Sequence, residues 1–343
     1  MRSADFDYPL PAERIAQHPL AERDASRLLH LRADGGLEDR RFTDLPELLR
    51  AGDLLVVNDT RVRRARLHGH DEAGRDVELL VLERGAGGSY DCLARPARLA
   101  SPGAVLRFGA DLRATVVAVA DGHPGGRTVT FDTDDADAAI ERAGIAPLPP
   151  YIRAELEDAD RYQTLYATGS PDSAAAPTAG LHFSQPVIDQ LRSAGIGWAT
   201  LRLDVGLATF APIRAERVEE HRIHEEHYDL PEAAASAIEA TRRSGGRVIA
   251  VGTTVVRVLE TCAGHDGIAR AGSGRTRLFI RPGHRFRVVD GLVTNFHQPR
   301  SSLLVLLAAF IGDDRWRAAY AHALQNGYRF LSLGDCMLCW RAS

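Results

Sequence analysis

The chain has 343 residues, of which 45% are hydrophobic and 26% are charged, and its formal net charge is −4. This is the composition of a globular protein with room for two domains, and the charge balance excludes an argument for nucleic-acid binding from bulk basicity. All 42 lysine-plus-arginine positions hold arginine, which excludes a Schiff-base lysine, as in pyridoxal-phosphate enzymes, and the lysine of a Walker A loop.

The ends of the chain and the cysteines indicate the compartment. Residues 1–17 contain acidic side chains and no apolar segment, so we expect no secretory signal. The longest apolar run, Leu303–Gly312, is too short to cross a bilayer and follows Ser301, a helix-capping residue type, so it predicts a buried helix. Four scattered cysteines form no disulfide framework. We expect a cytoplasmic protein.

The first third of the chain begins with a strand and continues into a β-rich stretch. The apolar run Leu54–Val57 ends in the polar cluster Asn58-Asp59-Thr60, which predicts a buried strand that delivers polar groups to its end. From about residue 70 to residue 146, short β-rich runs are separated by Gly, Pro and Asp. This pattern predicts a small all-β domain, a barrel or a sandwich, inserted in the chain.

After Tyr151, helical patterns alternate with apolar strands, which predicts a layered β/α domain. One predicted strand, in residues 247–251, leads through Gly252-Thr253-Thr254 into a helix. The free N–H groups at such a helix start bind anions, so a phosphate or a carboxylate could dock there, although a simple helix cap has the same pattern.

Polar residues gather where predicted elements end, in residues 58–62, 177–184, 219–227 and 294–299. In the second cluster Pro177 and Gly180 oppose a regular element, so His182 lies in a loop, either as a site residue or as a buried core histidine. In the third cluster His221 and His224 could share a zinc ion if the segment were helical. The pair Cys336 and Cys339 has no second pair to complete a metal site.

Many collinear segments resemble the S-adenosylmethionine:tRNA ribosyltransferase-isomerase family of queuosine biosynthesis. The most distinctive segments are "GDLLVVNDTRVRRARLHG", "AAPTAGLHF", "HRIHEEHY", "RVIAVGTTVVRVLE", "LFIRPGHRFRVVDGLVTNFHQPRSSLL" and "YRFLSLGDCML". The resemblance implies an α/β fold, with an α/β barrel-like main domain and a smaller inserted β-barrel domain. We place the main domain at 1–67 and 150–343 and the inserted domain at 68–149.

The resemblance also implies the reaction and its partners. The ribosyl unit of S-adenosylmethionine would move onto the 7-aminomethyl-7-deazaguanine at the wobble position of a tRNA with a GUN anticodon. It would isomerise there to epoxyqueuosine as adenine and methionine leave. No metal and no separate cofactor is implied, because S-adenosylmethionine is a co-substrate. We expect a monomer that does not bind membranes.

The chemistry assigns candidate roles within the matched segments. A base must take a C5′ proton next to the sulfonium, and our hypothesis is that His182 is this base or holds the ribose hydroxyls. Adenine leaves better when protonated, and Asp59, Glu226 and Asp335 are the candidate acids. Arg61, Arg257 or the Gly252-Thr253-Thr254 turn would take the methionine carboxylate. The remaining predicted substrate-binding residues are Asn58, Thr178, Gly180, His221, His224, Asn295 and His297.

The sequence departs from the family pattern at a few positions, and two other functions stay open. Asp204 stands where the family usually has histidine, before a segment that reads Ala208-Thr209-Phe210, and Gln298 stands where leucine is usual. The first alternative is a methyltransferase or lyase that uses S-adenosylmethionine on a small molecule, against which the absence of a GxGxG loop counts. The second is a non-catalytic tRNA-binding relative of the enzyme.

Overall fold

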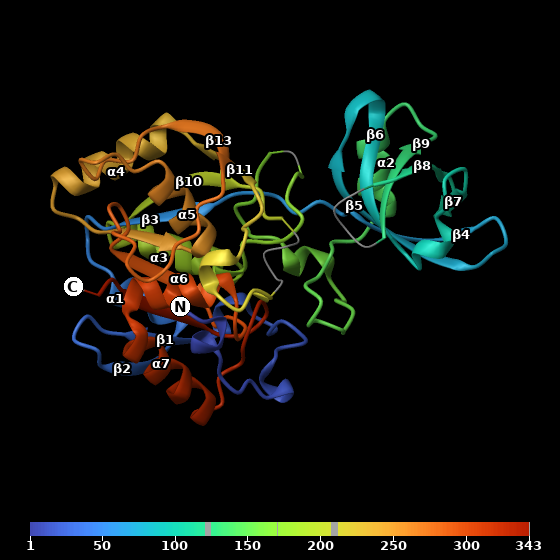
Figure 1. Cartoon of the computed structure of the whole chain (residues 1–343). Helices are drawn as coiled ribbons and strands as arrows, with labels where there is room; N and C mark the ends of the chain where they lie inside the picture. Colours follow the sequence, from blue (N-terminus) through green and yellow to red (C-terminus); the bar gives the residue numbers. More distant parts are fainter. Residues whose placement is uncertain (121–124, 170, 207–211, 343) are drawn as a thin grey trace. The chain divides into compact units, whose positions relative to one another are not determined.

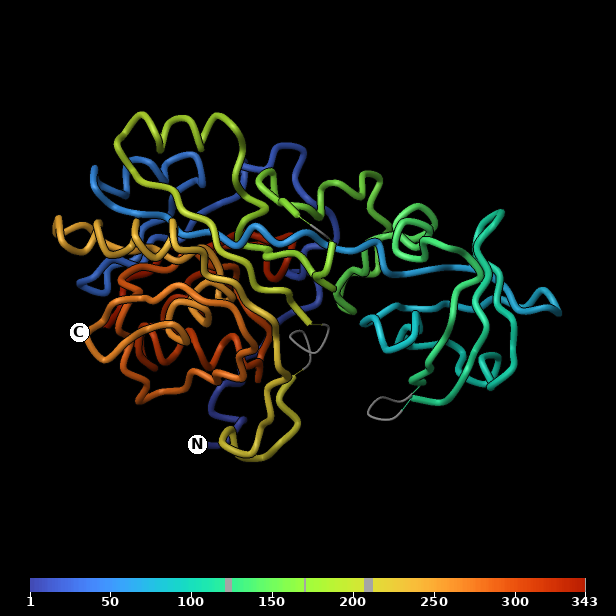
Figure 2. Tube along the Cα trace, turned by 90° about the horizontal axis from the view of Figure 1, so that it is seen from above, coloured from blue at the N-terminus to red at the C-terminus, as the bar shows by residue number. Residues whose placement is uncertain are grey.

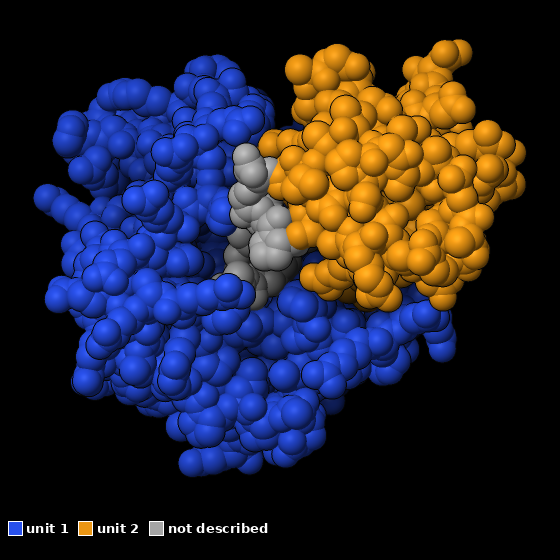
Figure 3. All heavy atoms as spheres, turned by 45° about the vertical axis from the view of Figure 1, so that its right-hand side comes forward, with its two compact units in different colours: residues 1–61, 149–343 blue, residues 62–148 orange. Residues whose placement is uncertain are grey.

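The computed structural model describes residues 1–120, 125–169, 171–206 and 212–342. The chain divides into two compact units, Met1–Arg61 with Pro149–Ser343 and Val62–Leu148 (Figure 3). The colours along the trace in Figure 2 show that the second unit is an insertion between two parts of the first. Residues 208–210, where the sequence departs from the family pattern, lie outside the described residues.

The second unit holds a closed antiparallel barrel of six strands in the order β4-β5-β6-β9-β8-β7. In β8, Leu112, Ala114 and Val116 are buried whereas Arg113 and Thr115 are exposed. Since successive side chains of a strand point to opposite faces, this alternation fills the barrel interior. The elements are β4 (Arg66–Asp71), β5 (Asp76–Arg84), β6 (Ser89–Arg95), β7 (Val105–Phe108), β8 (Leu112–Val119), β9 (Gly126–Phe131) and helix α2 (Ala136–Ala143). The predicted inserted β-barrel is confirmed.

The first unit is built on a mixed sheet of nine strands, which confirms the α/β class. In spatial order the strands are β13 (Gly272–Thr276), β11 (Glu226–Leu230), β10 (Gly197–Leu203), β3 (Leu54–Asn58), β12 (Val248–Val251), β14 (Gly291–Asn295), β15 (Cys336–Trp340), β1 (Arg27–Leu31) and β2 (Leu37–Arg41). Figure 1 shows β1 beside β15, although they come from opposite ends of the chain. In the described part of the chain the order has two ends, β13 and β2, so the sheet has two edges.

Helices cover both faces of this sheet and bury its apolar side chains. The helices α4 (Glu232–Arg243), α5 (Thr253–Thr261), α6 (Ser302–Ile311) and α7 (Asp313–Gln325) share one hydrophobic cluster with one face. The helices α1 (Leu45–Leu48) and α3 (Gln185–Ser193) share another cluster with the opposite face. The helix predicted from the apolar run after Ser301 is confirmed as α6, and no helix in the described residues is long and apolar enough to cross a membrane.

The direction of the strands brings many loops to one border of the sheet. The four central strands β10, β3, β12 and β14 run parallel, so their carboxyl ends lie along the same border, which we call the carboxyl edge. On β15, Cys336 and Cys339 belong to the clusters on opposite faces of the sheet, because side chains three residues apart in a strand point in opposite directions. The two thiols therefore cannot share a metal ion.

Candidate functional site

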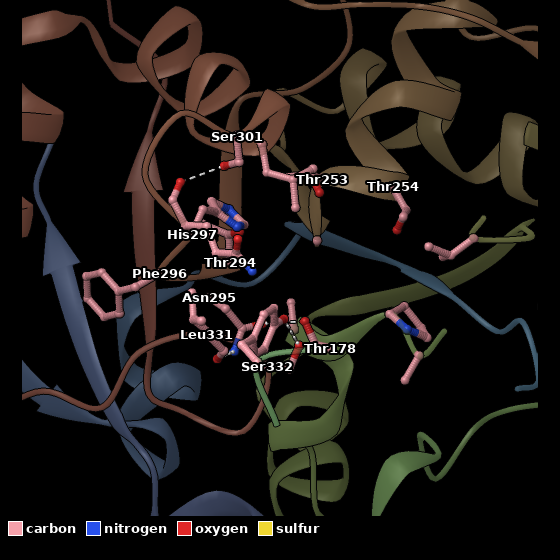
Figure 4. A pocket seen from close by; sticks show the side chains of 18 residues that line it. Thr178, Thr253, Thr254, Thr294, Asn295, Phe296, His297, Ser301, Leu331 and Ser332 are labelled. Carbon is pink, nitrogen blue, oxygen red and sulfur yellow. Dashed lines mark hydrogen bonds between the residues drawn. The ribbon is translucent and has the colours of Figure 1, made fainter. Parts of the chain in front are cut away.

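A pocket of about 640 Å³ lies at the carboxyl edge of the parallel strands. Figure 4 shows that its wall combines the loops that follow β12 and β14 with a short 3-10 helix, η8 (Thr178–His182). This is the position at which open α/β sheets bind ligands. The lining residues are Tyr151, Ala176, Pro177, Thr178, Ala179, Val205, Gly252, Thr253, Thr254, Thr294, Asn295, Phe296, His297, Gln298, Ser301, Leu303, Leu331 and Ser332.

One wall of the pocket is the start of α5. Its N-cap, Gly252, has φ 93° and ψ 155°, a conformation that side chains with a Cβ avoid. The N-cap Gly252 has no side chain that could cap this end, and the buried Thr253 and Thr254 continue the wall. The neighbouring helix α6 differs, since the Ser301 hydroxyl accepts from its own helix at Leu304 N–H. The first N–H groups of α5 are therefore the ones suited to hold an anionic group of a ligand.

A chain of hydrogen bonds runs from the pocket wall into the core. Thr178 Oγ1 donates to Asn295 Oδ1 at 2.9 Å, and Asn295 Nδ2 lies 3.2 Å from His182 Nε2. His182 Nδ1 in turn lies 2.9 Å from Ser26 Oγ. Burial and, secondarily, the charge of Arg329 lower the pKa of His182 to about 4. His182 is only 4% exposed and does not line the pocket, so it stands behind Asn295 rather than against a ligand.

The imidazole that does line the pocket is His297. Its Nε2 lies 2.9 Å from Thr294 Oγ1. Its backbone is held on both sides, because its N–H donates to the Tyr320 hydroxyl at 2.8 Å and its carbonyl accepts from the Tyr8 hydroxyl at 2.5 Å. Burial lowers the pKa of His297 to about 3, so the ring is neutral at pH 7. It presents a fixed, uncharged imidazole to the pocket.

A second pocket, of about 630 Å³, adjoins the first at Leu303. It collects four of the predicted site residues: His221, His224, Glu226 and Arg257. The Arg257 guanidinium forms a buried ion pair with Glu226, whose Oε1 also accepts from Gly206 N–H at 3.0 Å. Arg257 Nε donates to the Leu278 carbonyl. The charges of Arg257 and Glu226 thus pair with each other, and both side chains also form hydrogen bonds to the backbone within this wall.

The same segment bears on the zinc interpretation. The 3-10 helix at Val218–Glu220 ends just before His221, and the residues that follow are irregular, so the spacing of three does not place two imidazoles on one helix face. Among the described residues, no group of three or more His, Cys, Asp or Glu side chains could hold a metal ion.

Several other predicted site residues lie outside both pockets. The Asn58 side chain links the ends of β3 and β10, because its Oδ1 accepts from Leu203 N–H and its Nδ2 donates to the Leu203 carbonyl. Asp335 accepts from the N–H groups of Arg27 and Arg329, and burial raises its pKa. Both side chains therefore form hydrogen bonds to the backbone of neighbouring segments, Asn58 at Leu203 and Asp335 at Arg27 and Arg329.

The remaining three residues also have contacts outside the pockets. Asp59 Oδ2 accepts from Thr168 Oγ1, and burial raises the pKa of Asp59. Gly180 is packed so tightly that a Cβ would lie 2.1 Å from the Tyr166 hydroxyl oxygen. Arg61 is exposed, and its carbonyl accepts from Ser173 N–H.

Sequence reasoning missed some residues of the first pocket. Tyr151 and Ser332 face each other with their hydroxyl oxygens 2.6 Å apart, and Thr294 supports His297. Thr294 and Ser332 occur in the quoted segments that carry the family resemblance, so position in those segments was the available signal. No residue of the described lining carries a carboxylate or a guanidinium. The first pocket therefore offers hydroxyl, amide and imidazole groups in a largely apolar wall without a carboxylate or a guanidinium.

The fold and the site define an α/β protein with an inserted β-barrel and a pocket at the carboxyl edge of its parallel strands. The sequence model of the family described as "Queuosine biosynthesis protein" matches residues 3–339, so the chain belongs to this family. This confirms the resemblance seen in the sequence.

Similar proteins extend over almost the whole chain. S-adenosylmethionine:tRNA ribosyltransferase-isomerase from Moorella thermoacetica is 50% identical over 343 residues, covering 98% of this chain and 99% of that protein. The protein of the same name from Gloeobacter violaceus is 50% identical over 335 residues, covering 97% and 94%. The crystal structure of S-adenosylmethionine tRNA ribosyltransferase from Thermotoga maritima is 37% identical, covers 98% of this chain and 99% of its own, and has a TM-score of 0.56.

Proposed function

We propose that this protein transfers the ribosyl unit of S-adenosylmethionine to 7-aminomethyl-7-deazaguanine in tRNA and isomerises it, giving epoxyqueuosine, adenine and methionine. The observation that carries this proposal is the 50% identity, over nearly the full length of both chains, to relatives named for that reaction. The protein is thus a transferase of queuosine biosynthesis. The tRNAs that it uses carry a GUN anticodon, and it works as a monomer in the cytoplasm.

The first pocket is the proposed site of S-adenosylmethionine. The uncapped start of α5 takes the methionine carboxylate, because free N–H groups and the helix dipole favour an anion there. This leaves the predicted alternatives, Arg61 and Arg257, without that role. The atoms transferred to the base all come from S-adenosylmethionine, so no separate cofactor is part of the proposal.

His297 replaces His182 as the proposed proton acceptor for C5′. A base must lie within hydrogen-bond reach of the proton that it takes, and the ring of His297 lines the pocket whereas that of His182 does not. We expect His297→Ala to lower the rate of adenine release at least 100-fold, on the order of what a positioned base contributes, while the dissociation constant of S-adenosylmethionine changes little. A His297→Ala variant with normal turnover would remove this role.

The decisive experiment uses tRNA that carries the aminomethyl-deazaguanine. The purified protein is incubated with this tRNA and S-adenosylmethionine, and nucleosides and free adenine are measured by mass spectrometry. Epoxyqueuosine with one adenine per modified tRNA supports the proposal. Tight tRNA binding without adenine release favours the non-catalytic relative, and adenine release without tRNA modification favours a reaction on a small molecule.

A further inference from the structure

In the series of hydrogen bonds that runs from Thr178 through Asn295 and His182 to Ser26, each side chain donates to the next one toward the core. The two Asn295 Nδ2 hydrogens face His182 Nε2 and, at 3.3 Å, the Leu331 carbonyl. A flipped amide would set Asn295 Oδ1 against that carbonyl, two acceptors face to face, so the amide orientation is fixed. His182 Nε2 must then accept, and the ring carries its hydrogen on Nδ1.

The inner end of the chain agrees with this assignment. Ser26 Oγ donates to the Arg23 carbonyl at 3.4 Å, which leaves the Ser26 oxygen to accept from His182 Nδ1–H. Leu331 supports the same arrangement from the pocket side, since its φ of 70° is rare for a side chain of this kind and persists where surrounding structure fixes it. Its carbonyl also accepts from Gly334 N–H.

The pocket end of the chain therefore offers acceptors only. The hydrogen of Thr178 is used on Asn295 Oδ1, so the Thr178 oxygen presents lone pairs to a ligand, and Asn295 Oδ1 keeps a second lone pair. Figure 4 shows these two side chains together on one side of the pocket. A ligand group that meets this wall must donate a hydrogen bond.

We propose that Thr178 and Asn295 form an acceptor wall for the ribose hydroxyls of the bound nucleoside, and that His182 is the positioning residue that keeps Asn295 in this orientation. The inference rests on the proposed use of S-adenosylmethionine. Its ammonium is one competing donor, but the described lining holds no carboxylate to match a buried cation. The neutral adenine amino group is the other competing donor, and the deoxy analogues used below separate it from the ribose hydroxyls. Neutral hydroxyls need only neutral acceptors, which this wall supplies.

The test compares hydroxyl deletions in the ligand with hydroxyl deletions in the protein. Dissociation constants are measured by calorimetry for S-adenosylmethionine and its 2′-deoxy and 3′-deoxy analogues, with wild-type protein, Thr178→Val and Thr178→Ser. With wild-type protein we expect one deoxy analogue to bind about tenfold more weakly, as for a lost hydrogen bond in a site built to make it. Thr178→Val should reduce this penalty to about twofold, whereas Thr178→Ser should keep it, because the hydroxyl is retained. Equal penalties in wild-type protein and Thr178→Val would overturn the acceptor wall.

A second pair of variants tests the positioning role of His182. Glutamine can place an acceptor near the position of Nε2, whereas leucine cannot, so His182→Gln should keep the deoxy penalty and His182→Leu should lose it. Thermal unfolding of both variants separates this effect from misfolding. If both variants fold and show the same penalty, His182 does not position Asn295.

These binding experiments also distinguish the inference from the proposed function. Absence of adenine release from wild-type protein with the modified tRNA would contradict the function. Normal adenine release, together with the same deoxy penalty in wild-type protein and in Thr178→Val, would contradict only the acceptor wall.

Discussion

Glu260 holds the loop that leads into β14, the strand that carries Asn295. Its carboxylate, at the buried end of α5, accepts from the N–H groups of Arg287, Val288 and Val289 at 2.9, 3.0 and 3.1 Å. Hydrogen bonds to a charged group contribute about 1.5–3 kcal/mol each, and breaking a buried charged network costs about 3–5 kcal/mol, so Glu260→Ala should lower the free energy of unfolding by about 4 kcal/mol.

The measurement is the midpoint and slope of urea unfolding, with Glu239→Ala as the control. Glu239 lies on α4 in an exposed pair with Arg243, and such pairs contribute less than about 1 kcal/mol. A loss below about 1 kcal/mol for Glu260→Ala would refute the reasoning, since three buried N–H groups would then have lost their acceptor at almost no cost.

The pH dependence gives a second check on Glu260. Burial raises its pKa, but the His284 ring 3.5 Å away and the hydrogen bonds from the three backbone N–H groups outweigh this effect, so the pKa is lower in the folded protein than in the unfolded chain. The ionised carboxylate therefore stabilises the fold fully above the unfolded pKa, and this stabilisation is lost as the pH falls through the folded pKa. The stability difference between wild-type protein and Glu260→Gln should be constant near neutral pH and shrink in acid. A difference that grows in acid would contradict the assignment.

Three further predictions concern the site and its partner. Gly252→Ala should lower the free energy of unfolding by about 1–3 kcal/mol, because its backbone conformation is nearly exclusive to glycine. The same variant should raise the KM for S-adenosylmethionine, and an unchanged KM would mean that the start of α5 does not bind this substrate. Arg257→Met should cost about 3–5 kcal/mol in urea unfolding by leaving Glu226 buried without its partner, and Arg257→Met with Glu226→Leu should recover much of this loss. The affinity for tRNA, measured by filter binding, should fall linearly on a log–log plot against salt concentration, since phosphate contacts release counterions; a flat plot would mean that these contacts are minor.

The sequence predicted the loops of the site better than the side chains that face it. The clusters at 177–184 and 294–299 and the Gly252 turn were identified as strand or helix ends, and they converge because β12 and β14 are parallel neighbours and η8 lies beside β14. Hydrophobic periodicity identifies such ends without a tertiary structure. It does not fix which polar side chain at an end turns toward a pocket.

His182 and Asn58 illustrate that limit. Both lie in segments correctly marked as polar ends, yet Asn58 turns onto the backbone of Leu203 and His182 stands behind Asn295. The pairing of Glu226 with Arg257 was equally hidden, because it depends on the packing of α5 against β11, which no local pattern encodes. The sequence does not determine the orientation of a side chain that has two polar partners available, because only the packed fold chooses between them.

Asp204 shows how the structure limits the effect of a departure from the family pattern. Its Oδ1 accepts from Thr60 Oγ1 at 2.7 Å, and its Oδ2 lies 3.6 Å from His227 Nδ1. These contacts turn the carboxylate away from the pocket lining, to which the next residue, Val205, contributes instead. A histidine at this position would therefore alter the link between the ends of β3 and β11 before it altered the ligand. Because Asp204 is not among the described residues that line the first pocket, the departure is compatible with an unchanged pocket.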